Sequence, residues 1–241
     1  LHDYKNLLNK QTLKAILNIK KLDLNQTLHQ VNRNQLKEKH LVQMFDRYAT
    51  YNGSNPYKTS GIMSLIQHLE NNIGTFVPNK GMVEITNSLF KLAKRQGVEF
   101  LFNSRIDKIV TKKNKVQGVN SNGKFHESQI LVSNSDVYYT YKKLLGDRNK
   151  STKLSKIERS SSAVIFYWGI SRKFKMLDLH NIFFSNDYKK EFEHIFEKKS
   201  VFNDPTVYIN ITSKDVISDA PKNSENWFVM INVPSDSGQD W

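Results

Sequence analysis

The chain has 241 residues, of which 38% are hydrophobic and 11% aromatic, enough to bury a substantial core. It has no apolar run of the roughly 20 residues that a membrane-spanning helix needs. Because it has no cysteine, disulfides, thiolate metal sites and a cysteine nucleophile are excluded. Redox chemistry would therefore need a bound cofactor. These features are typical of a globular, intracellular protein that meets a membrane, if at all, from one side.

The net charge of +13 is spread along the whole sequence. The chain has 29 Lys but only 7 Arg, and the basic residues stand singly or in short groups. Proteins that recognise nucleic acid sequence-specifically rely on Arg for bidentate hydrogen bonds, so no nucleic-acid partner is expected. Two interpretations stay open: a bias of the source genome, which the 25 Asn favour, and attraction to anionic lipid.

Helical periodicity dominates the first hundred residues. Apolar residues at helical spacing predict two or three helices within residues 1–50, and one more around residues 62–69 after a loop at 52–56. A further helix is expected over 82–96, with Gly97 as its C-cap.

The apolar period then changes to 2, which indicates strands. We expect a strand at 98–102, an extended segment at 106–110, and a hairpin that pairs 115–119 with 125–132 across Asn122 and Gly123. Further along, the pattern predicts a helix over 136–145, a strand over 163–169, a mostly helical span through Phe196, and strands over 206–212 and 227–233. The fold class is therefore α+β or α/β, with two interleaved domains.

Short catalytic motifs are absent. The seven His show no metal-binding spacing, no GxSxG motif supports a hydrolase, and no GxGxxG dinucleotide fingerprint occurs. No general base stands out, and the catalytic residues stay unassigned.

Longer strings carry a family resemblance. They are FDRYATYNGSNPY at 45–57, TFVPNKGM at 75–82, ILVSNSD at 130–136, SSSAVIFYWGI at 160–170 and DPTVYINITS at 204–213. In this order they resemble the phytoene desaturase family, the bacterial FAD-dependent carotenoid desaturases. Lys80 departs from the family, which usually has a Gly there.

The resemblance implies an internal fragment of a two-domain, amine-oxidase-like flavoprotein. Residues 1–75 would form the helical part of a substrate and membrane-facing domain, 76–140 the middle of the FAD-binding domain, and 141–241 the antiparallel sheet of the substrate domain. The GxGxxG and C-terminal flavin motifs of the family would lie outside the fragment, which would be inactive alone.

Candidate cofactor residues follow from the resemblance. It implies that Ile106 passes the adenine of FAD, and that Ser133, Asn134 and Asp136 lie near its ribose or pyrophosphate. From the residues alone, Ile106 is equally a buried strand residue, and Asn134 and Asp136 equally mark a strand end and a helix N-cap.

Candidate substrate residues are mostly aromatic, because a long hydrocarbon needs an apolar, dry path. They are Arg47, Tyr48, Tyr51, Phe166 and Trp168. Alternation along a strand puts Phe166 and Trp168 on one face and Tyr167 on the other, where we expect Tyr167 to be packed. Each aromatic residue is also a candidate for the core, and Arg47 is also a candidate partner of Asp46.

The expected function is FAD-dependent desaturation of phytoene or a later carotenoid, by a cytoplasmic enzyme bound peripherally to the membrane. A hydroxycarotenoid 3,4-desaturase of the same family is an alternative. A non-catalytic basic protein that binds lipid surfaces or nucleic acid is another.

We predict that the 241-residue chain expressed alone does not retain FAD, because the family's main pyrophosphate site is a helix N-terminus inside the GxGxxG motif. The measurement is the flavin absorbance of the purified chain. A yellow protein with one flavin per chain contradicts this prediction.

Overall fold

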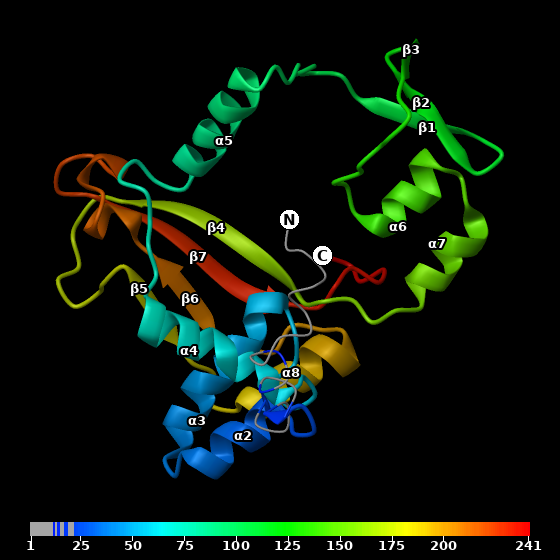
Figure 1. Cartoon of the computed structure of the whole chain (residues 1–241). Coiled ribbons are helices and arrows are strands. Elements are labelled where there is room, and N and C mark those ends of the chain that lie inside the picture. Colours follow the sequence, from blue (N-terminus) through cyan, green and yellow to red (C-terminus); the bar gives the residue numbers. More distant parts are fainter. Residues whose placement is uncertain (1–11, 13, 15–16, 19–21) are drawn as a thin grey trace. The chain divides into compact units, whose positions relative to one another are not determined.

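A computed structural model describes residues 12, 14, 17, 18 and 22–241 (Figure 1). The chain forms two compact units: the first comprises residues 1–82 and 160–241, and the second residues 83–159. The part of the helical region predicted for residues 1–50 that falls on residues 1–11, 13, 15, 16 and 19–21 lies outside the described residues. Whether the units are the substrate and FAD-binding domains stays a prediction, as do the predicted boundaries after residues 75 and 140.

Short helices form the N-terminal part of the first unit. They are α2 (Leu28–Gln35), α3 (Lys39–Asp46), the 3₁₀ helices η3 (Arg47–Asn52) and η4 (Gly61–Met63), and α4 (Ser64–Ile73). A capping box starts α2, in which Thr27 accepts from the amide of Gln30 and the Gln30 side chain accepts from the amide of Thr27. This satisfies two amides that would otherwise lack partners.

A buried carboxylate joins α2 to the end of α3. Asp46 is 1% exposed, and its two oxygens contact Nδ1 of His29 at 2.6 Å and Nδ2 of Asn32 at 2.8 Å. Burial raises the pKa of Asp46, while both hydrogen bonds oppose the shift. The backbone where η3 begins is therefore fixed by a satisfied polar group inside the core.

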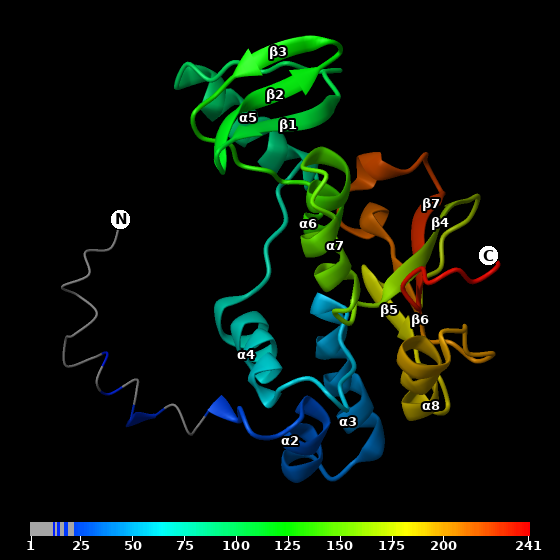
Figure 2. The same cartoon turned by 90° about the vertical axis from the view of Figure 1, so that its right-hand side faces the viewer.

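An antiparallel sheet of four strands forms the rest of the first unit (Figures 1 and 2). Its order is β4 (Ser162–Ile170), β7 (Glu225–Val233), β6 (Val207–Asn210) and β5 (His180–Phe183). The three predicted strands are confirmed. The prediction of a mostly helical span through Phe196 is wrong in part. Residues 171–187 form loops and β5, and the helix begins only at α8 (Tyr188–Glu193). Residues 180–183 escaped prediction because their apolar run is too short to separate strand from helix.

Two apolar clusters hold the first unit together. One gathers Tyr188, Phe192, Ile195 and Phe196 on α8 and the following π-helical turn η6 (His194–Lys198). The other joins Ile209, Ile211 and Val229 across β6 and β7. Burial of such side chains, at about 25 cal/mol per Å², is the main stabilising term.

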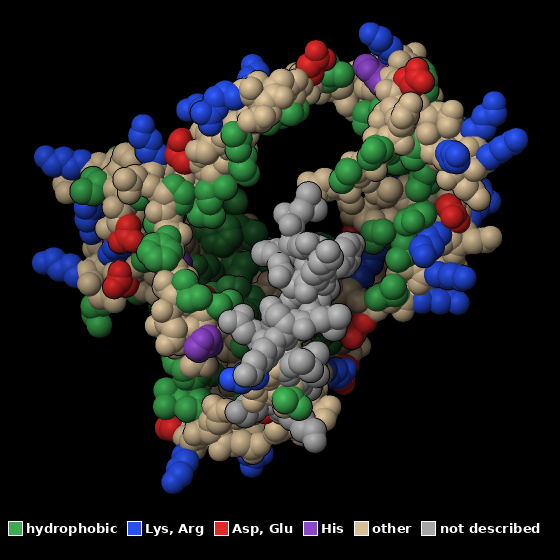
Figure 3. Space-filling model, in the orientation of Figure 1, with side chains coloured by type: hydrophobic (Ala, Val, Ile, Leu, Met, Phe, Trp, Pro, Cys, Tyr) green, Lys and Arg blue, Asp and Glu red, His purple; other side chains and the backbone are tan. Residues whose placement is uncertain are grey.

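The second unit contains a helix, a meander and a helical pair. Helix α5 (Val83–Arg95) is followed by Gly97, whose φ of 81° is left-handed, as predicted for a C-cap. Figure 3 shows α5 with hydrophobic side chains on one side and Lys and Arg on the other. Strands β1 (Ile106–Lys112), β2 (Lys115–Ser121) and β3 (Lys124–Glu127) lie side by side in Figure 2, and the predicted hairpin is confirmed. The chain continues through α6 (Val137–Tyr139), the π-helical turn η5 (Thr140–Leu144) and α7 (Arg148–Ser155).

Two predicted extended segments do not form strands. Residues 98–102 and 129–132 pair with no described strand, so the predicted strand at 98–102 is wrong and β3 stops at Glu127. Their apolar side chains are exposed: Phe102 to 69%, Ile130 to 83% and Val132 to 86%. A strand without a hydrogen-bonding partner is not stable, which explains the difference from the sequence pattern.

The predicted fold class, a mixture of helices and antiparallel sheets, is confirmed. Among the described helices, none combines the length and apolarity that crossing a bilayer requires.

Replacing Gly53 by Ala should destabilise the first unit. Gly53 has a φ of 66°, and an added Cβ would lie 2.8 Å from Cβ of Ser160. Strain and this clash together should cost about 1–3 kcal/mol, measured as a lower melting temperature.

Gly146→Ala is the matched control, because Gly146 has a φ of 68° but no atom near the added Cβ. Equal losses in the two variants would attribute the whole effect to the backbone and contradict the role of the contact with Ser160.

Candidate functional site

A cleft of about 520 Å³ lies within the second unit. Its apolar wall comes from β1, β2 and the segment after β3, and includes Ile106, Ile109, Val119 and Leu131. Its polar lining comes from the loop at 133–135 and from the charged residues Arg105, Asp107 and Lys143, with Nε of Arg105 3.9 Å from the Asp107 carboxylate. Apolar walls with a few polar groups at one end are typical of a small-molecule site.

A network of hydroxyls shapes the loop at 133–135. The Oγ atoms of Ser133 and Ser135 lie 3.0 and 2.7 Å from Oγ1 of Thr140, which also bonds the carbonyl of Asp136. The side-chain amide of Asn134 has no partner among the described residues, so it is free to bind a ligand. The cleft therefore combines a fixed loop with one uncommitted amide.

Three of the four predicted cofactor residues come together in this cleft. Ile106, Ser133 and Asn134 line it. Ile106 lies at the start of β1, where the register with β2 shifts. Asp136 is not among the lining residues, and its carboxylate accepts from the amide of Tyr139 as the N-cap of α6. Contact with FAD stays a prediction for all four.

An aromatic ladder leads from α3 into η3 in the first unit. The rings of Phe45 and Tyr48 lie 6.1 Å apart, and those of Tyr48 and Tyr51 lie 5.7 Å apart with only 11° between their planes. A 3₁₀ helix has three residues per turn, so side chains three residues apart lie above one another. The local helix type therefore stacks the two predicted tyrosines.

Glu70 on α4 accepts hydrogen bonds from both tyrosines. The Tyr48 hydroxyl lies 2.7 Å from Oε2, and the Tyr51 hydroxyl bonds Oε1. Burial and then the bond to Glu70 raise the pKa of Tyr48, and the same causes raise the pKa of Tyr51 to about 12. Both phenols are therefore protonated at neutral pH.

Arg47 does not form an ion pair with Asp46, so the alternative role that the sequence offered for it is wrong. Asp46 bonds His29 and Asn32 instead, and no described carboxylate lies within ion-pair distance of Arg47. Its guanidinium lies 5.8 Å from the ring centre of Tyr208 on β6. Burial raises the pKa of Tyr188, and the charge of Arg47 opposes this shift.

The two faces of the sheet divide the remaining aromatic residues. Directly paired residues share a face, so Phe166 lies with Val229 and Trp168 with Trp227 on the face that contains the buried cluster at Ile209. The rings of Phe166 and Trp168 are 5.8 Å apart, as their predicted common face requires.

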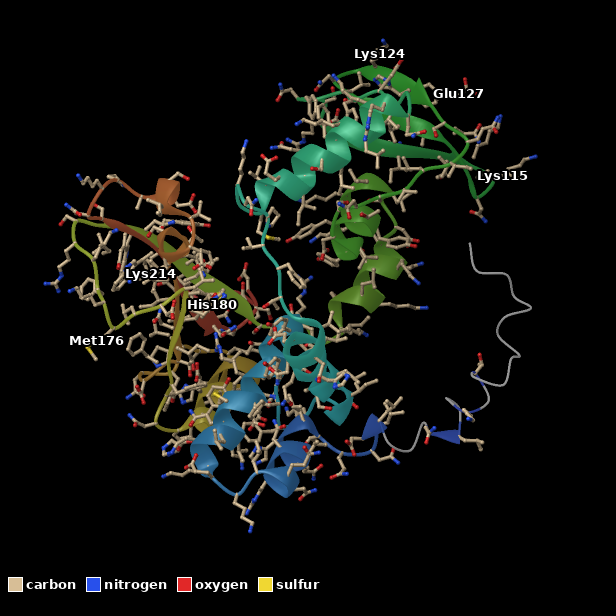
Figure 4. The ribbon with its side chains drawn as sticks, turned by 60° about the vertical axis from the view of Figure 1, so that its left-hand side comes forward. Lys115, Lys124, Glu127, Met176, His180 and Lys214 are labelled. Carbon is tan, nitrogen blue, oxygen red and sulfur yellow. The ribbon has the colours of Figure 1, made fainter. Side chains whose placement is uncertain are left out.

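The opposite face carries Tyr167, Phe228 and Tyr208 in ring contact. Tyr167 is 80% exposed, so it is not the packed residue that the sequence predicted. Nδ1 of His180, labelled in Figure 4, lies 2.8 Å from the Tyr208 hydroxyl at the edge of this face.

The structure does not bring all five predicted substrate residues together. Arg47 lies against the face of Tyr208, whereas Phe166 and Trp168 point to the other face. Sequence reasoning missed Tyr208, Phe228 and Glu70. The alternation in VYIN and NWFVM carried the signal for the two aromatic residues, but nothing in the sequence around Glu70 indicates its partners.

Comparison with curated proteins finds close relatives. The chain is 55% identical over 241 residues to a 1-hydroxycarotenoid 3,4-desaturase from Flavobacterium sp. (strain P99-3), covering all of the chain and 49% of the relative. It is 31% identical over 209 residues to a phytoene desaturase from Neurospora crassa, covering 82% of the chain and 35% of the relative. A 4,4'-diaponeurosporene oxygenase from Staphylococcus aureus is 29% identical over 225 residues, covering 92% of the chain and 45% of the relative. The chain thus spans half or less of these relatives.

No family model matches the chain. Among solved structures, an oxidoreductase from Methanosarcina mazei superposes with a TM-score of 0.64 at 14% identity, covering 96% of the chain and 54% of that protein. At this identity the likeness concerns the fold alone.

Proposed function

Because the chain belongs to the carotenoid desaturase family, we propose that it is part of an FAD-dependent oxidoreductase that desaturates a carotenoid. One observation carries this proposal: the 55% identity to a 1-hydroxycarotenoid 3,4-desaturase over all 241 residues. The same observation favours a hydroxylated carotenoid over phytoene, because the phytoene desaturase of Neurospora crassa is only 31% identical.

The cleft of the second unit fits one end of FAD. Its apolar wall at Ile106 and Val119 suits a planar base, while the free Asn134 amide suits sugar hydroxyls. The charged lining residues are Arg105, Asp107 and Lys143, so the lining keeps a net positive charge, which favours a nearby phosphate. Bound FAD would supply the two-electron acceptor for removal of two hydrogens from the carotenoid.

The exposed aromatic face of the first unit suits a polyene. Tyr167, which is exposed to 80%, and the partly buried rings of Phe228 and Tyr208 offer flat, apolar surface, and Arg47 lies against Tyr208. A face of this kind would hold a long hydrocarbon by shape and keep water from its saturated carbons. We therefore propose the substrate path at Tyr167, because Phe166 and Trp168, the residues that the sequence favoured, are only about half as exposed, at 45% and 46%.

Peripheral membrane contact, on the cytoplasmic side, is part of the proposal. The substrate class is lipid-soluble, and α4 with the segment after it exposes Leu69, Ile73 and Phe76, the last to 87%. Such side chains, together with scattered lysines, favour a lipid surface.

The complete gene product should desaturate a 1-hydroxylated carotenoid faster than the same carotenoid without the hydroxyl. The reason is the greater identity to the hydroxycarotenoid enzyme. The measurement is pigment analysis after expression in cells that accumulate one substrate or the other. Desaturation of neither substrate contradicts the proposed function, and a preference for phytoene selects the second candidate, a phytoene desaturase.

Replacing Asn134 by Ala in the complete protein should lower its flavin content at purification several-fold, because one hydrogen-bonding group of the cleft is lost. Asn149→Ala is the matched control, since Asn149 is an exposed residue of α7 outside the cleft. Unchanged flavin content in Asn134→Ala would remove this residue from the FAD site.

A further inference from the structure

The carboxylate of Glu70 with the hydroxyls of Tyr48 and Tyr51 forms a polar group that we call the acceptor cluster. We infer that the acceptor cluster binds the hydroxyl end of the carotenoid and so fixes which bond is desaturated. This inference rests on the proposed function and names the specificity determinants of the same site.

The atoms of the acceptor cluster that remain available to a ligand are all hydrogen-bond acceptors. Each phenol has one proton, and both protons are donated to Glu70. No described Lys or Arg lies within ion-pair distance of Glu70, so its oxygens keep free lone pairs. The phenolic oxygens also keep lone pairs. A ligand group that donates a hydrogen bond fits this cluster, whereas an ether, a ketone or a methyl group does not.

The acceptor cluster is rigid and open to a ligand. Stacking of Tyr48 on Tyr51 fixes both rings, and Asp46 anchors the backbone immediately before η3. Tyr51 is nonetheless 63% exposed. A preformed polar group that a ligand can reach loses little conformational entropy when it binds.

The acceptor cluster adjoins the aromatic face proposed for the polyene. Arg47, one residue before Tyr48, lies over the ring of Tyr208. Tyr208 is also close enough to Tyr51 to contribute to the raised pKa of its phenol. A polyene on this face could therefore bring one end to the cluster.

A hydroxyl anchor solves a problem that shape alone does not. A polyene is nearly uniform along its length, so apolar contacts hold it without fixing its position lengthwise. In the name of the Flavobacterium relative, the hydroxyl is on carbon 1 and the new double bond joins carbons 3 and 4. A hydrogen bond at carbon 1 would thus fix carbons only two and three positions away.

The test uses the complete enzyme with three substrates: a 1-hydroxylated carotenoid, its 1-O-methyl ether and the parent hydrocarbon. The variants are Tyr51→Phe and Glu70→Gln. We expect kcat/KM for the hydroxylated substrate to fall about tenfold or more in each variant, because sites that bind a hydroxyl discriminate strongly through it. The values for the ether and the hydrocarbon should change less than about twofold.

Glu127→Gln is the matched control, since Glu127 is an exposed carboxylate of β3, labelled in Figure 4, outside both parts of the site. Melting temperature and flavin content identify variants that fail to fold, and Tyr48→Phe provides a further variant of the cluster. Equal losses on all three substrates, or no loss on the hydroxylated one, would overturn the inference. Wild-type enzyme that converts none of them would instead overturn the proposed function.

Discussion

The buried carboxylate of Asp46 is the constraint on which the first unit's site depends. It holds His29 and Asn32 of α2 with its two oxygens, and the chain passes directly from it into η3. Removing one partner of a buried carboxylate leaves an uncompensated polar group, which is far more costly than losing an exposed hydrogen bond. The stacking of Tyr48 on Tyr51 and the reach of Arg47 toward Tyr208 follow from a backbone fixed in this way.

Local patterns predicted much of the fold. The Gly97 cap and the hairpin at Asn122 and Gly123 depend on neighbouring residues, so periodicity and turn chemistry were sufficient for them. The failures share one cause, since they concern segments whose state depends on distant partners. Residues 98–102 carry a strand pattern but have no described strand to pair with, and β5 forms only because β6 pairs with it.

In the candidate site, too, residues that are close in the sequence were predicted and those brought together by the fold were missed. Ile106, Ser133 and Asn134 were predicted and share one cleft, because the β1 start and the following loop are joined within one unit. The assignment of Phe166 and Trp168 to one face was sound, but which face suits a substrate depends on what packs against the sheet. Glu70 was not predicted because a single Glu on an amphipathic helix ordinarily faces solvent, and only the fold brings it to Tyr48 and Tyr51.

The close approach of Gly53 to Ser160 and Ser161 has a consequence for how the chain folds. The carbonyl of Gly53 accepts from the amide of Ser161 at 2.8 Å, so the first unit is closed by a contact between residues 108 positions apart, since 161 − 53 = 108. Within that span lies the whole second unit, residues 83–159. The entropy of closing a loop grows only with the logarithm of its length, so enlarging this insertion has a small effect on stability. Its main effect is on rate, because high contact order slows folding. The region between these two points can therefore lengthen during evolution with little thermodynamic penalty, provided that the residue facing Ser160 remains a glycine.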